Sequence, residues 1–180
     1  MSPAAAGGDE ILARARGVRL AIFDVDGVLT DGTLWIGADG EAFKAFDIHD
    51  GHGVKMLRES GVATAILSGR SSPAVIRRAA ELSITHVIQG AADKAVAFDR
   101  LLRDTGVEPH ACAFVGDDLP DLAVMRRCGF AVAVANAVEA VKRSAHYVTS
   151  ASGGRGAVRE FCELVLRARG QLADGAGVSR

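Results

Sequence analysis

The chain has 180 residues, of which 49% are hydrophobic and 24% charged, and its formal net charge is −1. This length allows one domain with a full hydrophobic core, and the balanced charge gives no electrostatic reason to expect nucleic acid as a partner. No apolar run reaches the roughly 18 residues that cross a bilayer, and the opening MSPAAAGGDE lacks the basic and apolar regions of a signal peptide. We therefore expect a cytoplasmic protein that acts on small molecules and has no membrane partner.

Short apolar runs alternate with amphipathic segments along the chain. The candidate strands are residues 18–24, 62–68, 85–90, 111–117, 130–136 and 146–149. Several runs are apolar on both faces, which is typical of buried parallel strands. The alternation predicts an α/β fold with a doubly wound, mostly parallel sheet and right-handed crossovers. We expect this domain to span residues 18–170, after an N-terminal extension (1–17, with a short helix near Glu10–Arg16) and before a C-terminal tail (171–180).

Capping residues mark several helices between these runs. Ser72 before Pro73, and Asp93 before KAVAFDRLLRDT, are typical helix N-caps. Three glycines are expected to end helices, namely Gly61, Gly106 and Gly129.

Residues 33–47, TLWIGADGEAFKAFD, do not fit the alternation of strands and helices. Apolar and polar residues alternate there about a central Gly-Ala-Asp-Gly turn. This pattern predicts a β-hairpin inserted soon after the first strand.

The cysteines Cys112, Cys128 and Cys162 are odd in number, far apart in the sequence and flanked by small apolar residues. This usage predicts buried free thiols in a reducing compartment.

Polar residues follow the predicted strands. Ligands bind beyond the carboxyl ends of the strands in an open parallel sheet, so these residues should meet at one edge. In chain order they are Asp24 with Asp26, then Ser68, Gly69 and Arg70, then Lys94 at a helix start, then Asp117, Asp118 and Asp121.

This set of residue types suits phosphoryl transfer through an aspartyl phosphate. A crowded carboxylate can attack phosphorus when a hard cation such as Mg²⁺ screens the charge around it, and Asp24 and Asp117 are the natural ligands. Asp26 could act as general acid and then as general base. Ser68 and Lys94 could hold the phosphoryl oxygens.

Each of these features alone has an ordinary structural explanation. An Asp-x-Asp pair, an SGR segment or a GDD segment can be a turn or a helix cap, and a single helical lysine is usually solvated. Their order along the chain, each at a predicted strand end or helix start, favours a catalytic site.

These residues also form a pattern seen in a known superfamily. DVDGVLTDG, ILSGR, Lys94 in QGAADK, and GDDLPD resemble the four motifs of the haloacid dehalogenase superfamily of Mg²⁺-dependent phosphatases. TDG, the hairpin, KAFDIHDGHGVKML, THVIQG and GGRGAVRE add a similarity to its 3-deoxy-D-manno-octulosonate (KDO) 8-phosphate phosphatase family, from about Val18 to Leu166. The resemblance implies an enzyme of lipopolysaccharide precursor synthesis. It also implies a domain without a large cap, in a homotetramer whose hairpins and C-terminal segments help close neighbouring active sites.

The resemblance further implies roles for single residues. Asp24 would be the nucleophile and a metal ligand, Asp26 would bind the metal through its backbone carbonyl, and Asp117 would complete the protein ligands. Asp118 would lie beside metal and substrate, and Asp121 would orient the cluster. Substrate contacts are implied for Asp26, Asp47, Ile48, His49, Asp50, Gly51, Lys55, Arg70, Arg78, Lys94 and Asp118. The basic members of this set could pair with the carboxylate and phosphate of a sugar acid phosphate.

Each of three further features allows two interpretations. Residues 153–156, Gly-Gly-Arg-Gly, are either a flexible lead into the helix AVREFCELVLRAR or a loop on which Arg155 covers the substrate. His49 and His52 could bind metal by residue type, but their Gly and Asp neighbours favour substrate-facing or solvated side chains. Asp31 could touch the metal, but we expect it instead to order the loop that launches the hairpin.

Other functions stay open. The nearest rival is a phosphatase for a nine-carbon sugar acid 9-phosphate, although GGRGAVRE favours the eight-carbon substrate. A phospho-receiver domain also combines aspartates, a hydroxyl and a lysine, but here the hydroxyl comes second and Asp26 is placed for turnover. A catalytically silent relative is disfavoured because all four motifs are intact. A dinucleotide enzyme is disfavoured because no GxGxxG follows the first strand.

Overall fold

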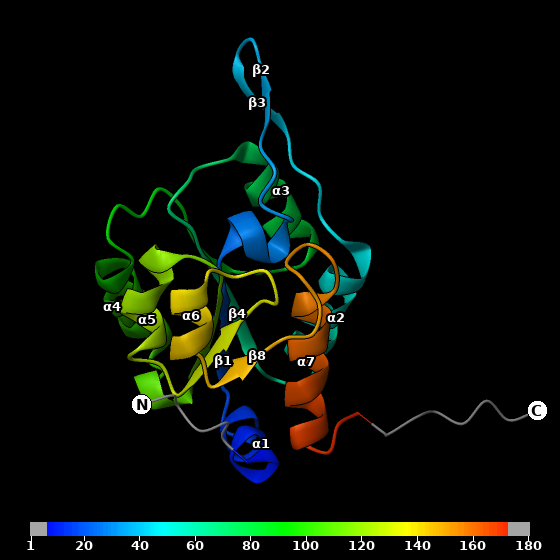
Figure 1. Cartoon of the computed structure of the whole chain (residues 1–180), viewed down its shortest axis with the longest axis vertical. Helices are drawn as coiled ribbons and strands as arrows, with labels where there is room; N and C mark the ends of the chain where they lie inside the picture. Colours follow the sequence, from blue (N-terminus) through cyan, green and yellow to red (C-terminus); the bar gives the residue numbers. More distant parts are fainter. Residues whose placement is uncertain (1–6, 173–180) are drawn as a thin grey trace, which may run out of the picture.

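The computed structural model describes residues 7–172, in which a six-stranded sheet lies between two layers of helices (Figure 1). The strands follow the order β5-β4-β1-β6-β7-β8, and every neighbouring pair is parallel. Each strand falls inside one of the predicted apolar runs. They are β1 (Leu20–Phe23), β4 (Ala63–Leu67), β5 (His86–Ile88), β6 (Cys112–Gly116), β7 (Phe130–Ala133) and β8 (Tyr147–Val148). The predicted doubly wound α/β fold is confirmed.

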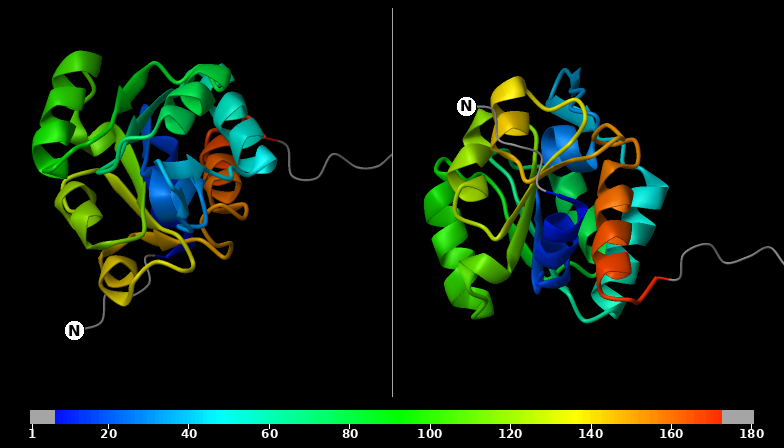
Figure 2. Two further views of the ribbon diagram at one scale, coloured as in Figure 1. Left: turned by 90° about the horizontal axis from the view of Figure 1, so that it is seen from above. Right: turned by 60° about the horizontal axis from the view of Figure 1, so that its bottom comes forward.

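Two groups of helices cover the two faces of the sheet (Figure 2). One layer holds α1 (Gly8–Arg16) and α2 (Ile48–Glu59), which both pack on α7 (Ala157–Ala168), and α3 (Pro73–Glu81) lies beside α2. The other layer holds α4 (Lys94–Thr105), α5 (Leu122–Met125) and α6 (Glu139–Ser144). Within the described residues, no helix is both long enough and apolar enough to cross a membrane.

Capping explains where α4 begins and ends. The Asp93 carboxylate accepts hydrogen bonds from the backbone of Ala95 and Val96 and so starts α4, as predicted. Gly106 ends α4 in the left-handed conformation, with φ of 65°. The prediction for Gly129 was wrong, because α5 ends at Met125 and Gly129 directly precedes β7. A Cβ on Gly129 would lie 1.9 Å from the carbonyl oxygen of His110, so a close backbone approach explains this glycine.

The predicted hairpin is present. Its strands β2 (Trp35–Gly37) and β3 (Gly40–Phe43) pair antiparallel. The hairpin projects from the same end of the domain as the short helical turn η1 (Val25–Leu29), which follows β1 (Figure 1). Trp35 stacks on Phe43 at 5.0 Å between ring centroids, yet both side chains are about half exposed.

The helix predicted in the N-terminal segment is present as α1, and it packs on the domain rather than standing apart. Ala15 is buried, Arg16 donates a hydrogen bond to the carbonyl of Ala168, and Arg14 donates one to Gly129. Residues 1–6 of the expected extension, and residues 173–180 of the expected tail, lie outside the described residues. The three cysteines are free and buried, as predicted.

Asp50 joins α2 to the start of α7. It is 1% exposed, and its two carboxylate oxygens accept hydrogen bonds from the backbone N–H groups of Arg159 (2.7 Å) and Gly156 (3.3 Å). Arg159 lies in the first turn of α7 and Gly156 is the N-cap residue before it, and N–H groups at this end of a helix have no acceptor within the helix. In this chain Asp50 therefore acts as a tie between two helices.

We predict that Asp50→Ala lowers the free energy of unfolding by about 2–3 kcal/mol, because it leaves two buried backbone donors without an acceptor. Urea denaturation measures this change. Asp104→Ala is the matched control, since the Asp104 side chain is 52% exposed and pairs loosely with Arg100 at 3.6 Å. Equal free energies of unfolding for the two variants would show that Asp50 does not stabilise the contact between α2 and α7.

Candidate active site

Asp24 directly follows β1, the strand at the middle of the sheet. All four residues of β1 are buried, and β1 pairs with β4 on one side and with β6 on the other. The backbone N–H of Asp24 continues the ladder by donating to Val115 at 3.1 Å. Asp24 is 7% exposed, and its carboxylate is thus fixed at the carboxyl edge of the sheet.

The other motif residues reach the same edge from β4, the start of α4 and the end of β6. Together they surround a cavity of about 420 Å³. Its lining includes Asp24, Asp26, Ser68, Gly69, Arg70, Lys94, Asp117, Asp118 and Asp121. The structure therefore brings together the residues that strand ends and helix starts singled out, while the role of each stays a prediction.

Lys94 lies between two of the carboxylates. Its Nζ is 2.9 Å from Oδ1 of Asp24 and 2.6 Å from Oδ1 of Asp121, and its side chain is 6% exposed. Burial acts to lower the pKa of Lys94, but the charges of the two aspartates outweigh it and raise that pKa. Lys94 is therefore an ammonium ion across the physiological pH range.

Asp121 supports the cluster through both of its oxygens. Oδ1 binds Lys94, while Oδ2 accepts hydrogen bonds from the backbone N–H groups of Asp117 (2.9 Å) and Asp118 (3.2 Å). Gly116 makes room for it, since a Cβ there would lie 2.7 Å from Oδ2 of Asp121. Asp121 therefore holds the loop that carries Asp117.

The carboxylates of the cavity fit a divalent cation. Asp24, Asp117 and Asp121 each offer an oxygen within 4.8 Å of the others, and when all three are ionised Lys94 offsets only one of their charges. In the described part of the chain, the buried Oδ1 of Asp117 has no hydrogen-bond donor. Oxygen donors of this kind are those that Mg²⁺ prefers. Because the Asp121 oxygens already have donors, Asp24 and Asp117 are the side chains that could hold the ion.

Crowding changes the protonation of these two carboxylates. Burial, followed by the charge of Asp121, raises the pKa of Asp24 to about 6. Burial, followed by the charge of Asp24, raises the pKa of Asp117 to about 8. A bound cation would oppose both shifts, because it favours the ionised form of each ligand.

The turn after Asp24 depends on a glycine. Gly27 has φ of 95°, and a Cβ on it would lie 2.0 Å from Oδ2 of Asp117. The glycine of DVDG therefore leaves the space that the Asp117 carboxylate occupies.

Residues 153–156 pack against this turn from behind. The N–H of Gly154 donates to the carbonyl of Val28 at 2.8 Å, and a Cβ on Gly153 would lie 1.7 Å from the carbonyl oxygen of Gly27. Arg155 forms an ion pair with Asp31 at 3.2 Å and is not among the residues that line the cavity. In this chain the segment is a backbone support for the DVDG turn, and Asp31 orders the next loop by accepting from the N–H of Thr33.

Asp26 is held from the side of the hairpin. Its Oδ1 binds Nζ of Lys44 at 2.5 Å, and its Oδ2 lies 3.8 Å from Nε of Arg70. Sequence reasoning missed Lys44 and Glu41, whose only local signal was their position in the alternating hairpin segment. The contact of Lys44 with Asp26 joins residues 18 positions apart, and that of Glu41 with Ser72 joins residues 31 positions apart.

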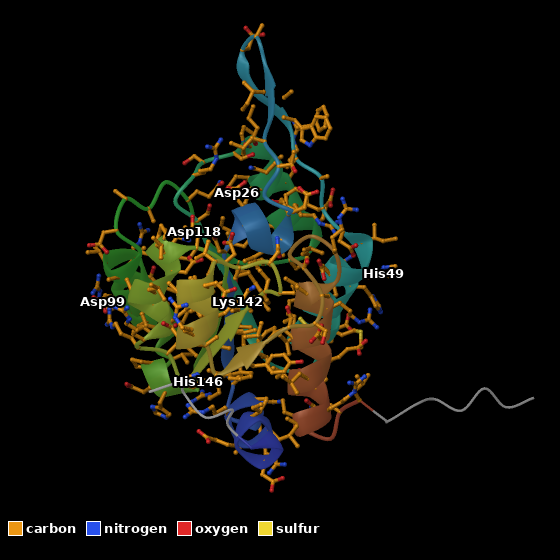
Figure 3. The ribbon with its side chains drawn as sticks, viewed as in Figure 1. Asp26, His49, Asp99, Asp118, Lys142 and His146 are labelled. Atoms are coloured by element: carbon orange, nitrogen blue, oxygen red, sulfur yellow. The ribbon has the colours of Figure 1, made fainter. Side chains whose placement is uncertain are left out.

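The remaining residues expected to bind substrate do not line this cavity. Asp47 caps α2 through the N–H groups of His49 and Asp50, and Asp50 ties α2 to α7. Figure 3 shows His49 on the outer side of α2, away from Asp26 and Asp118. A second cavity of about 150 Å³ is lined by Ile48, Gly51, His52, Lys55, Arg78 and Leu82.

Arg78 is already engaged within the chain. It donates to the carbonyl of Asp47 at 3.2 Å and forms an ion pair with Glu81 at 3.1 Å. A Cβ on Gly51 would lie 2.2 Å from its Nη2, so Gly51 makes space for the guanidinium. Within one chain, these residues build the α2–α3 contact.

The parallel sheet, with its aspartates and lysine at the carboxyl edge, defines a haloacid dehalogenase-like hydrolase, and the family model of that description matches residues 83–161. A 3-deoxy-D-manno-octulosonate 8-phosphate phosphatase from Yersinia pestis is 45% identical over 171 residues, which are 95% of this chain and 91% of that protein. The chain therefore belongs to the 3-deoxy-D-manno-octulosonate 8-phosphate phosphatase family, and it is a phosphomonoesterase.

Solved structures agree with this assignment. A probable YrbI family phosphatase from Pseudomonas syringae pv. phaseolica has a TM-score of 0.89 and 51% identity, over 92% of this chain and 94% of that one. A 3-deoxy-D-manno-octulosonate 8-phosphate phosphatase from Moraxella catarrhalis, in complex with a magnesium ion, a phosphate ion and KDO, has a TM-score of 0.88. That chain is 45% identical, over 91% of this chain and 94% of its own length.

We predict that Gly27→Ala lowers kcat/KM for 4-nitrophenyl phosphate by about a hundredfold, because the new methyl group displaces the Asp117 carboxylate. Assays of phosphate release with Mg²⁺ measure this loss. Gly61→Ala is the matched control, since Gly61 also has a positive φ of 86° but no atom within 4 Å of the added Cβ. A similar loss in both variants would show that backbone strain, rather than the contact with Asp117, is responsible.

Proposed function

We propose that this phosphatase hydrolyses 3-deoxy-D-manno-octulosonate 8-phosphate to KDO and inorganic phosphate, as a cytoplasmic step in lipopolysaccharide precursor synthesis. The observation that carries the proposal is the cluster of Asp24, Lys94 and Asp117 in a cavity that Ser68 and Arg70 also line. The name and ligands of the Moraxella catarrhalis relative support the choice of sugar.

The proposed reaction begins with attack by the Asp24 carboxylate on phosphorus. Bound Mg²⁺, held by Asp24, Asp117 and the backbone carbonyl of Asp26, would supply charge neutralisation for two anions that approach each other. A bond forms between an Asp24 oxygen and phosphorus while the bond from phosphorus to the sugar oxygen breaks. Asp26 gives a proton to that departing oxygen.

The second step releases phosphate from Asp24. Asp26, now a carboxylate, takes a proton from a water molecule, whose oxygen attacks phosphorus. The bond between phosphorus and Asp24 breaks, which regenerates the free carboxylate. Asp26 thus ends each cycle protonated, ready for the next leaving group.

Ser68 and Lys94 would hold the phosphoryl oxygens in both steps. Ser68 is 2% exposed, and its Oγ accepts a hydrogen bond from the N–H of Arg70 at 3.3 Å, which leaves its own hydrogen to donate to the phosphoryl group. Lys94 adds a positive charge beside the attacking oxygen. Both groups are fixed in place before the substrate arrives, so little reorganisation opposes the reaction.

The sugar acid would meet Arg70 in the same chain and basic residues from a neighbouring one. Lys55 and Arg78 line the second cavity, so in our proposal they face a substrate bound to another chain of a homotetramer. The half-exposed Trp35 and Phe43 of the hairpin are the kind of apolar surface that such an assembly covers. Asp118 lines the catalytic cavity, and in our proposal it would lie beside both metal and substrate.

A panel of sugar phosphates tests this proposal. We predict that, with Mg²⁺, kcat/KM for 3-deoxy-D-manno-octulosonate 8-phosphate exceeds that for nine-carbon sugar acid 9-phosphates and simple phosphomonoesters by at least about tenfold, because binding of the whole sugar lowers the barrier. Asp24→Asn is the inactive control, and Asp99→Asn on the exposed face of α4 is the active one. Preference for a nine-carbon acid, or for none of the sugars, would overturn the substrate assignment.

A further inference from the structure

Lys44 connects the base of the hairpin to Asp26. It directly follows β3, and its side chain is only 2% exposed. Its Nζ lies 2.5 Å from Oδ1 of Asp26 and 2.8 Å from Oε2 of Glu41. Removing this ammonium would leave the partly buried carboxylates of Asp26 and Glu41 without the charge that lies between them, which is costly.

Glu41 connects Lys44 to Ser72 and to Arg70 of the SGR motif. Oε1 of Glu41 accepts a hydrogen bond from the hydroxyl of Ser72, at the start of α3, and Oε2 lies 3.7 Å from Nη2 of Arg70. The charge of Lys44 is therefore shared by two anions. The base of the hairpin, the SGR motif and Asp26 form one connected network.

Lys44 reaches Asp26 from outside the catalytic cavity. Asp26 and Arg70 line that cavity, whereas Lys44 lines a different one of about 400 Å³ between β3 and α3. Lys44 holds Oδ1, so Oδ2 of Asp26 is the oxygen left for the leaving group. Asp26 sits on an irregular turn, where a side chain without fixed partners would sample several rotamers.

We propose that Lys44 is a positioning residue for Asp26, and that Glu41 holds Lys44 in place for this task. The hairpin thus sets the geometry of proton transfer in its own chain. The inference rests on the proposed role of Asp26 as general acid. Lys44 itself touches neither substrate nor metal in this account.

Aryl phosphates with different leaving groups test the inference. Phenyl phosphate releases a basic phenolate that needs a proton, whereas 4-nitrophenyl phosphate releases a weakly basic anion that does not. Loss of a positioned acid should therefore slow the first ester far more than the second, and the two are similar in size. The quantity compared is kcat/KM, which reports the steps up to departure of the first product.

Lys44→Met is expected to lower kcat/KM for phenyl phosphate on the order of tenfold and for 4-nitrophenyl phosphate less than about threefold, since acid catalysis contributes about a hundredfold or more in total. Lys44→Arg should recover part of the loss. Glu41→Gln, which keeps the side-chain shape, should show the same selectivity at smaller size. The double variant Lys44→Met/Asp26→Asn should be no slower than Asp26→Asn, because the two residues act through one step.

Lys142→Met is the matched control. Lys142 lies on α6, in the helix layer that also holds α4 and α5 (Figure 3), and it pairs with Glu139 at 3.1 Å. Its replacement should leave both rates unchanged. Circular dichroism and thermal unfolding verify that each variant is folded. If Lys44→Met does not fold, Glu41→Gln decides.

The outcomes separate this inference from the function on which it rests. If Asp26→Asn slows both esters equally, Asp26 is not the acid and the proposed mechanism fails, together with the inference. If Asp26→Asn is selective for phenyl phosphate but Lys44→Met and Glu41→Gln slow both esters equally, or neither, the mechanism stands and the role of Lys44 is overturned.

Discussion

The site depends on one electrostatic constraint, the crowding of Asp24, Asp117 and Asp121 around a single buried ammonium. Lys94 neutralises part of this charge and the backbone N–H groups that bind Asp121 offset another part. Among the described residues no donor reaches Oδ1 of Asp117, so this oxygen is free to bind a cation. The fold can hold such a cluster because the strands behind it are fully buried and rigid, so the carboxylates cannot move apart.

Backbone packing fixes the same cluster from behind. Gly27 and Gly153 lie so close to Asp117 and to each other that neither position has room for a side chain. Residues 153–156 arrive from the far end of the chain and lead into α7, which Asp50 ties to α2. The catalytic turn is therefore stabilised by two helices of one layer, α2 and α7, which links the stability of the domain to the geometry of its site.

The sequence predicted the features that local pattern controls. Apolar runs located the strands, Asp93 and Gly106 bounded α4, and Asp24, Ser68, Lys94 and Asp117 were singled out because the carboxyl ends of parallel strands share an edge. Features set by contacts between distant residues were not predicted. Gly129 was misinterpreted because the carbonyl of His110 approaches it in space, and Asp50 and Lys44 have partners that no local spacing reveals.

The central claim is that Asp24 is the carboxylate that attacks phosphorus. Its most direct test mixes the enzyme with sugar phosphate and Mg²⁺, quenches in acid within one turnover, reduces with borohydride and maps the modified residue by mass spectrometry. An acyl phosphate is reduced to an alcohol, so the account predicts that residue 24 becomes homoserine, only when both substrate and cation are present. Modification of Asp26 or Asp117 instead, or of no carboxylate at all, would contradict it.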